Sequence, residues 1–236
     1  MAIPISIGYT NCLPRVLQGS FDGRRLGGAY ETRGFFVRDL LKGSELSTQE
    51  GHDGSVSGLA FNRAGTLLAT GGQDQRVGRW NLGDLTLVGP LRKAHAGKGH
   101  TMVDFVPGTD QLVSSGSDAE LLLWPAGDRQ EEPLPLIGHR RPAYAFAFTP
   151  DGGRLIAGDG DKQVFSWEIN PEHWRRNACR VANRNLTHDE WDLYVGSGPP
   201  RKTCPELRDL ASSVTHETVS GQAARTVMMC FRGCRP

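Results

Sequence analysis

The sequence lacks three features that would each mark a class of protein: an excess of one charge, a long apolar run and a leader peptide. Lysine plus arginine number 27 against 26 aspartate plus glutamate, so there is no basic excess of the kind that attracts nucleic acid. No apolar stretch approaches the roughly 20 residues of a membrane-spanning helix, and residues 1–14 lack the basic start and apolar core of a secretory signal. We therefore expect a cytoplasmic protein that binds neither nucleic acid nor membranes.

Cysteine is also scarce, and its spacing suits neither a disulfide framework nor a zinc knuckle. The five cysteines are scattered, odd in number and without a CxxC pair, which favours reduced thiols. Cys179 and Cys204 could pair, but sequence separation does not show whether their Cα atoms come within bridging distance, and two buried thiols are the favoured interpretation. His95 and His100 have no companion ligands at zinc spacing, so the sequence predicts no metal and no cofactor.

A repeat runs through the first 170 residues. Glycine and proline number 30 and 14 and fall between short apolar runs, which is typical of short strands joined by turns. Three tryptophans recur at intervals of about 44 residues, and three histidines preceded by a small residue keep the same interval. These markers are Trp80, Trp124 and Trp167, with Gly51-His52, Ala94-His95 and Gly138-His139.

The same succession of runs lies between the markers. A strand ending in phenylalanine (Phe61, Phe105 or Phe148) is followed by a polar turn and by a second apolar run that closes on an aspartate. These second runs read LLATGGQD, LVSSGSD and LIAGDGD, and the third runs read VGRW, LLLW and VFSW. Each unit is predicted to form a small antiparallel sheet.

This pattern resembles the WD40 family, whose repeat of about 40 to 45 residues carries GH near its start and WD near its end. The resemblance covers residues 51–170 well. A weaker copy lies upstream, where FDGRRLGGAY and FFVRDL take the places of the second and third strands, Arg38-Asp39 takes that of Trp-Asp, and Gly8-Tyr9 is a worn GH. The resemblance implies an all-β fold, a partial β-propeller of about four blades. The first blade, residues 1–43, is degenerate, and three clear blades follow in residues 44–170.

The resemblance also implies a hydrogen-bonded chain of four side chains in a blade: histidine, a hydroxyl residue, aspartate and tryptophan. Such a chain satisfies buried polar groups, and we interpret it as structural, because a hydrolase nucleophile would have to be exposed beside an oxyanion site. No catalytic residue is predicted. The third clear blade has Ala157 at the hydroxyl position, so its chain is broken unless a water or Asp159 substitutes. The implied sets are His52, Thr70, Asp74 and Trp80; His95, Ser114, Asp118 and Trp124; and His139, Asp161 and Trp167.

After Asn170 the strand rhythm stops. Residues 171–207 are predicted to form two short helices, the second opened by a capping box from Thr187 to Glu190, and residues 208–236 a disordered tail. This part resembles the closing segment of large bacterial WD40 proteins fused to signalling NTPases of the STAND class. The chain has no GxxxxGK[ST] phosphate loop, so no NTPase activity is carried over. The resemblance rests on Cys179, Asn183, Leu186, Trp191 and Cys204-Pro205.

The predicted function is a scaffold for protein–protein interaction. Two alternatives stay open: a truncated fragment without autonomous function, and an enzyme with an active site in the propeller channel. We also expect either self-association through the unclosed propeller ends, by way of the segment from Ile3 to Leu41, or poor solubility of the chain when it is made alone. Tyr144 is the expected hot spot of the binding face. That face, implied by the resemblance, comprises Ser55, Ser57, Gln73, Gly99, Thr101, Ser117, Pro142, Tyr144 and Gly160.

Overall fold

The computed structural model describes residues 15–30, 33–48, 51–97, 99–127, 131–195, 199 and 201–207, the side chains of Ser47, Thr48 and Tyr144 excepted. The worn Gly8-Tyr9 and the tail from residue 208 lie outside these residues. The chain divides into two compact units, residues 1–152 with 156–166, and residues 153–155 with 167–236. Helices in the described part of the chain are too short and too polar to cross a membrane.

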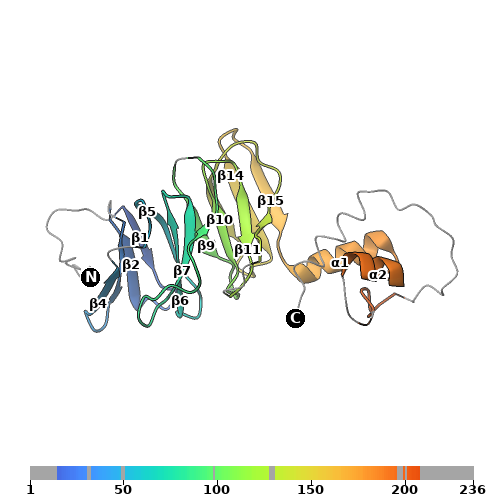
Figure 1. Cartoon of the computed structure of the whole chain (residues 1–236), viewed down its shortest axis with the longest axis horizontal. Coiled ribbons are helices and arrows are strands. Elements are labelled where there is room, and N and C mark those ends of the chain that lie inside the picture. The colour runs from blue at the N-terminus through green and yellow to red at the C-terminus, as the bar shows by residue number, and fades with distance from the viewer. Residues whose placement is uncertain are drawn as a thin grey trace. The chain divides into compact units, whose positions relative to one another are not determined.

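The first sheet is built from the segment in which the sequence predicts a degenerate blade. Its four strands are antiparallel and follow chain order, β1 to β4 (Figure 1). Because β4 pairs with β3, this sheet extends one strand past residue 43, where the sequence repeat is predicted to end. The strands are β1 (Val16–Gly19), β2 (Arg25–Ala29), β3 (Phe35–Asp39) and β4 (Glu45–Thr48).

The second and third sheets repeat this pattern with four antiparallel strands each. The fourth sheet has three strands in the described part of the chain, in the order β13-β14-β15. Four antiparallel sheets confirm the predicted all-β class. The strands are β5 (Val56–Phe61), β6 (Leu67–Gly72), β7 (Arg76–Asn81), β8 (Arg92–Lys93), β9 (Met102–Phe105), β10 (Leu112–Ser115), β11 (Leu121–Trp124), β12 (Leu134–Pro135), β13 (Ala143–Phe148), β14 (Arg154–Asp159) and β15 (Val164–Glu168).

Neighbouring sheets are joined by apolar cores. Successive residues of a strand point to opposite faces, so Leu68 packs toward the first sheet and Ala69 toward the third. The buried residues of the first core are Ala29, Phe35, Val37, Val56, Leu59, Phe61, Leu68, Trp80, Leu82 and Leu85. Those of the second core are Ala60, Ala69, Val77, Val103, Phe105, Leu112, Leu122 and Trp124.

The second and third sheets approach each other closely where β5 and β6 face Thr101, the residue before β9. A Cβ atom on Gly71 would lie 2.3 Å from the carbonyl oxygen of Thr101, and one on Gly58 would lie 2.7 Å from the same atom. Ser57 completes the contact, since its hydroxyl lies 3.1 Å from that carbonyl oxygen and accepts the Thr101 N–H at 2.9 Å. The two glycines are therefore required by packing and not by a turn.

The second unit contains the predicted helical pair, α1 (Pro171–Ala182) and α2 (His188–Tyr194). Asn170 caps α1, and the expected capping box of Thr187 and Glu190 opens α2. Glu190 also receives a two-pronged bond from the Arg184 guanidinium, with both N–O distances 2.6 Å. This bond is the main reason that the pKa of Glu190 falls to about 2.

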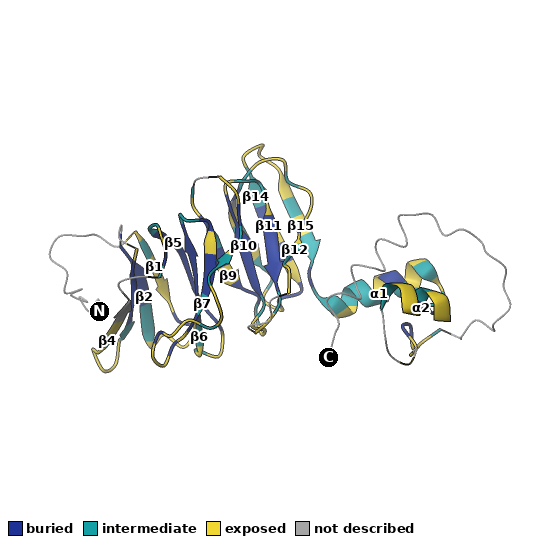
Figure 2. Ribbon diagram, viewed as in Figure 1, coloured by how far each residue is buried: buried dark blue, intermediate teal, exposed yellow. Residues whose placement is uncertain are grey.

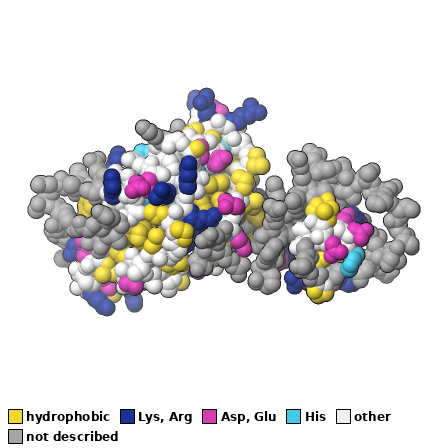
Figure 3. Space-filling view, in the orientation of Figure 1, with side chains coloured by type: hydrophobic (Ala, Val, Ile, Leu, Met, Phe, Trp, Pro, Cys, Tyr) yellow, Lys and Arg dark blue, Asp and Glu magenta, His cyan; other side chains and the backbone are white. Residues whose placement is uncertain are grey.

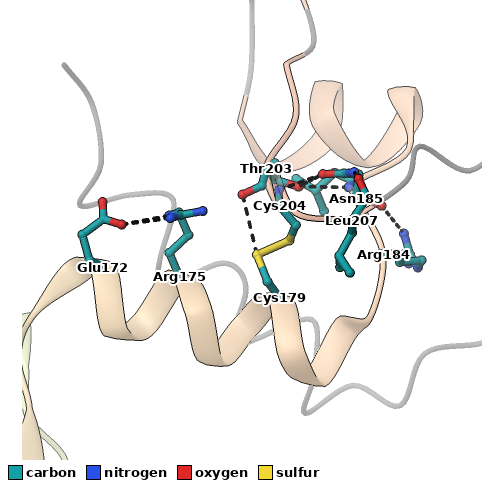
Figure 4. The surroundings of a disulfide bond; sticks show 9 residues. Glu172, Arg175, Cys179, Arg184, Asn185, Thr203, Cys204 and Leu207 are labelled. Atoms are coloured by element: carbon teal, nitrogen blue, oxygen red, sulfur yellow. Dashed lines mark hydrogen bonds and ion pairs between the residues drawn. A yellow bond between two sulfur atoms is a disulfide. The ribbon is translucent and has the colours of Figure 1, made fainter.

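A disulfide ties the segment after α2 to α1, which corrects the expectation of two reduced thiols. The Cα atoms of Cys179 and Cys204 are 5.6 Å apart, within the range that a disulfide bridges (Figure 4). Asn185 reinforces the link, because its side-chain oxygen accepts the Cys204 N–H at 2.7 Å and its amide nitrogen donates to the Leu207 carbonyl at 3.1 Å. The loop between the helices is thus fixed by covalent and polar contacts together.

Candidate functional site

The second sheet brings one predicted set of four side chains into a single chain of hydrogen bonds. His52 precedes β5 and Asp74 lies in the turn between β6 and β7, at the same end of the sheet. His52 Nδ1 is 3.0 Å from Asp74 Oδ1, and its Nε2 is 2.7 Å from the hydroxyl of Thr70. That hydroxyl also accepts the indole N–H of Trp80 at 2.8 Å.

The direction of each bond follows from the groups involved. An ionised carboxylate only accepts, so His52 donates from Nδ1 to Asp74, and its Nε2 shares a hydrogen bond with the Thr70 hydroxyl. Thr70 is fully buried, so its oxygen is not available as a nucleophile. Asp74 further accepts the backbone N–H groups of Asp53 and Arg76. The set therefore fastens the loop before β5 to the β6–β7 turn.

The third sheet carries the same arrangement. His95 Nδ1 lies 3.0 Å from Asp118 Oδ1, and its Nε2 lies 2.9 Å from the hydroxyl of Ser114, which accepts the Trp124 indole N–H at 2.9 Å. Burial lowers the pKa of His95, and the Asp118 carboxylate offsets part of that effect. When neutral, His95 donates from Nδ1 to Asp118 and accepts the Ser114 hydroxyl proton at Nε2.

In the fourth sheet the structure corrects the predicted partner of His139. Its Nδ1 lies 3.7 Å from a carboxylate oxygen of Asp159, whereas Asp161 pairs with Arg141 at 3.5 Å. Asp159 takes the position of Gly72 in the second sheet, where a Cβ atom would lie 2.3 Å from His52 Nδ1. A side chain at that position displaces the imidazole from the place it has in the second sheet and puts the Asp159 carboxylate beside it.

Other residues of the fourth sheet agree with this displacement. Ala157 offers no hydroxyl, and the ring of Phe165 packs edge-on against His139 with ring centres 4.6 Å apart. Trp167, the remaining member of the predicted set, stands in β15. No set of four was predicted in the first sheet. There the ring of Phe36 covers Gly28, since a Cβ atom on that glycine would lie 2.4 Å from the ring.

One group of side chains in the described part of the chain has the composition of a metal site. The ligand atoms of His95, Asp118 and Glu120 lie within 4.8 Å of one another. Both ring nitrogens of His95 are already engaged, and Asp118 accepts the Ala96 N–H at 2.7 Å and the Glu120 N–H at 3.2 Å. A cation would have to displace the bonds that hold the turn, so we assign this group to structure.

The predicted binding face divides into two groups of residues. The prediction is wrong for Thr101, which is fully buried in the contact between the second and third sheets, and Ser57 is half-buried in the same contact. Tyr144 stands in β13, and its side chain lies outside the described residues. The remaining residues are half-buried or exposed, and we call them the turn face: Ser55, Gln73, Gly99, Ser117, Pro142 and Gly160.

Two further residues that sequence reasoning missed hold this part of the molecule together. Gln75 is buried and donates from its amide to the carbonyls of Gln73 and Gly99, which joins loops of two neighbouring sheets. Arg79 on β7 donates to the carbonyls of Pro125 and Gly127, both at 2.6 Å. Only its place beside the marker Trp80 could have drawn attention to Arg79, and nothing in the sequence indicates its partners.

Comparison with known proteins identifies the repeats. A family model for the WD domain, G-beta repeat, matches residues 43–81 and 131–168. The chain is 31% identical over 113 residues to the transcriptional corepressor LEUNIG_HOMOLOG of Arabidopsis thaliana, and 27% identical over 161 residues to human DDB1- and CUL4-associated factor 5. These alignments cover 47% and 65% of this chain but only 14% and 15% of the relatives. The chain thus carries WD40 repeats and spans a small part of these relatives.

A solved structure shows the same fold. The chain superposes on a chain in the crystal structure of the mitotic checkpoint complex with a TM-score of 0.58 and 22% identity, covering 66% of this chain and 48% of that one. The described sheets are therefore those of a WD40 propeller-like fold, left open.

The matched repeats are displaced from the sheets by one strand. Residues 43–81 include β4 of the first sheet and then β5 to β7 of the second, and residues 131–168 include β12 of the third sheet and then β13 to β15 of the fourth. One sequence repeat therefore supplies the outer strand of one sheet and the three inner strands of the next.

Proposed function

We propose that this chain is a scaffold that binds another protein through the turn face and performs no catalysis of its own. The observation that carries the proposal is the pair of histidine–aspartate contacts at one end of the second and third sheets. Each contact fixes a loop to a turn, and Gln73 and Ser117 stand directly beside the fixed aspartates. Loops held in place before binding lose less conformational entropy when a partner docks.

The charges near this face favour a partner with polar and charged groups of both signs. Arg76 pairs with Asp53 at 3.4 Å and Arg141 with Asp161 at 3.5 Å, and all four side chains are well exposed. Exposed ion pairs of this kind contribute little to stability, so their groups can exchange partners at an interface. The names of the relatives, a corepressor and an associated factor, support a role in assembly with other proteins.

The experiment is site-specific photo-crosslinking in the cell that makes the protein. A crosslinking residue replaces Gln73 or Ser117 on the turn face, and the matched controls replace Ala64 or Thr109, which are exposed in turns at the other end of the sheets. We expect adducts of discrete mass at the two turn-face positions only. Equal adducts at the control positions, or none at the turn face, would count against the proposal.

The captured protein then allows a test of the expected hot spot. Tyr144→Ala should weaken its affinity by roughly ten-fold or more, the size of effect typical of an aromatic anchor. Leu193→Asp, on the second unit, serves as control and should leave the affinity unchanged. An unaltered affinity for the Tyr144 variant would remove that residue from the interface.

We further propose that the scaffold belongs to a larger bacterial signalling protein and acts in the cytoplasm. The support is the likeness of residues 171–207 to the closing segment of such proteins; the relatives quoted above are eukaryotic. Reading the gene upstream of Met1 in its genome tests this setting. An intergenic region of unrelated sequence there would overturn it.

A further inference from the structure

A group of basic side chains stands where the turn face continues onto the fourth sheet. The loop before β13 and the turn between β14 and β15 meet there, since His139 Nδ1 lies 3.7 Å from a carboxylate oxygen of Asp159 and Arg141 lies 3.5 Å from one of Asp161. These two segments carry three exposed cations, which we call the basic end: Arg140, Arg141 and Lys162.

The basic end lies at the surface of the described part of the chain. In Figure 3, Lys and Arg side chains gather at the uppermost end of the sheet-bearing part, where Figure 1 places the upper ends of β14 and β15. Figure 2 shows exposed residues in the loops at this end, in contrast to the buried strands β10 and β11 of the third sheet. The side chain of Arg141 is 66% exposed although it forms an ion pair. A partner can therefore reach the cations from solvent.

Nearby carboxylates neutralise only part of this charge. Asp161 pairs with Arg141, and both side chains are exposed. The side chain of Asp159 is 1% exposed and accepts two backbone N–H groups of the turn. Within the described residues, Arg140 and Lys162 have no ion pair. Three cations against one exposed carboxylate leave the surface of this end basic.

The matching positions of the second and third sheets are not basic. Directly after the marker histidine, the second sheet has Asp53 and the third has Ala96, whereas the fourth has Arg140. Directly after the marker aspartate, the second and third sheets have neutral residues, whereas the fourth has Lys162. Side-chain bonds from these two cations to the turn are absent among the described residues. The two charges therefore remain available for a contact outside the sheet.

Uncharged surface adjoins the cations. Ile137 lies two residues before His139 and is 76% exposed. Pro142 is half-buried and Gly160 exposed, each next to one of the two segments' charged residues. Interfaces bury apolar area inside a polar and charged rim, so a segment that fits here combines carboxylates with an apolar side chain.

We infer that the partner bound at the turn face presents an acidic segment with an apolar residue to the basic end of the fourth sheet. The inference rests on the proposed scaffold function and adds to it the chemistry of the partner and the place where its acidic part docks. Opposite charges across an interface orient the partner and speed its encounter more than they raise affinity. The basic end therefore sets which way round the partner docks.

The rest of the turn face favours a protein segment over a nucleic acid as the occupant. A nucleic acid requires cations along several successive phosphates. This face also carries the exposed carboxylates of Asp53 and Asp161, and the Asp53 side chain is 70% exposed. Glu120 is exposed at the matching turn of the third sheet. These acids would repel a long polyphosphate but leave room for a short acidic segment confined to the fourth sheet.

The first test maps the docked segment. A crosslinking residue replaces Gln163, which is exposed beside Lys162, and the protein captured through Gln73 is digested to identify the peptide joined at each position. We expect the peptide joined at Gln163 to come from that same protein and to be rich in aspartate and glutamate. A peptide without acidic residues, or an adduct with nucleic acid or lipid at Gln163, would overturn the inference.

The second test measures how fast the captured protein associates with the full chain at increasing salt. A charge-reversed variant, Arg140→Glu with Lys162→Glu, should associate roughly ten-fold more slowly at low salt and lose most of the salt dependence. Arg140→Lys with Lys162→Arg keeps both charges and should retain the wild-type rate. The matched control, Arg24→Glu with Lys42→Glu, changes the net charge equally on exposed turns at the other end of the first sheet and should also retain it.

The scaffold function and this inference fail in different ways. A protein captured at Gln73 and Ser117 that associates equally fast with the charge-reversed variant overturns the inference and leaves the scaffold function standing. Equal slowing by the matched control assigns the effect to net charge and overturns it as well. No adduct at Gln73 or Ser117 removes both proposals.

The fold of the charge-reversed variant is checked by circular dichroism. Its spectrum should be that of the wild type, because substitutions at exposed residues such as Arg140 and Lys162 change stability little. If the double variant unfolds, Arg140→Glu alone takes its place, with Arg24→Glu as its control and the same expected direction.

Discussion

The Asp74→Ala substitution tests the most specific structural assignment, the fastening of two loops by a histidine–aspartate contact. The Asp74 carboxylate accepts hydrogen bonds from His52 Nδ1 and from the backbone N–H groups of Asp53 and Arg76. Water can replace it at the two exposed backbone groups, but His52 is 3% exposed and would keep a buried donor without an acceptor. That situation costs about 1–3 kcal/mol.

The fourth sheet supplies two controls for this prediction. Asp161 occupies the matching turn, but its side chain is 47% exposed and pairs with the exposed Arg141, so Asp161→Ala should change stability by no more than about 0.5 kcal/mol. Asp159 is buried beside His139 and accepts the N–H groups of Asp161 and Gln163. The expected order of loss is therefore Asp74, then Asp159, then Asp161.

Urea denaturation followed by tryptophan fluorescence measures the order, because Trp80 belongs to the same network as Asp74. With a slope of about 2 kcal/mol per molar urea, a loss of 1–3 kcal/mol moves the midpoint by about 0.5–1.5 M. The slope should stay constant among the variants. Equal losses for Asp74→Ala and Asp161→Ala would refute the structural account of both turns.

Two further predictions concern pH and redox state. Because burial lowers the pKa of His95 in the folded chain, the unfolded chain takes up the proton first as the pH falls. The stability of the sheets should therefore be complete above about pH 6.5 and decline below it. Thermal melts across this range measure the effect, and a melting temperature that does not change between pH 7 and 5 would contradict it. Reduction of the Cys179–Cys204 bond should increase hydrogen exchange in the residues after α2, which it ties to α1, without altering exchange in β5 to β7; unchanged exchange at residues 201–207 would mean that Asn185 alone suffices.

The sequence by itself determined the repeat. The recurring histidine, the second run closing on aspartate and the tryptophan predict three sheets, because a four-stranded antiparallel unit needs those strands and turns in that order. The hydrogen-bonded sets of the second and third sheets could be named as well, because the resemblance to WD40 repeats implies them at Thr70 and Asp74 and at Ser114 and Asp118. The capping box of α2 was readable from spacing alone, since its partners are three residues apart.

Only the tertiary structure decided which atoms from distant parts of the chain meet. Asp161 has the right spacing from Ala157, yet Asp159 lies beside His139, because a side chain replaces the glycine against which the imidazole rests in the other sheets. The pairing of Cys179 with Cys204, the donation of Arg79 to Pro125 and Gly127, and the burial of Thr101 depend likewise on how separate segments pack. Spacing along the chain fixes neighbours within a sheet, but the distance between one sheet and the next is set by the volumes of the side chains between them.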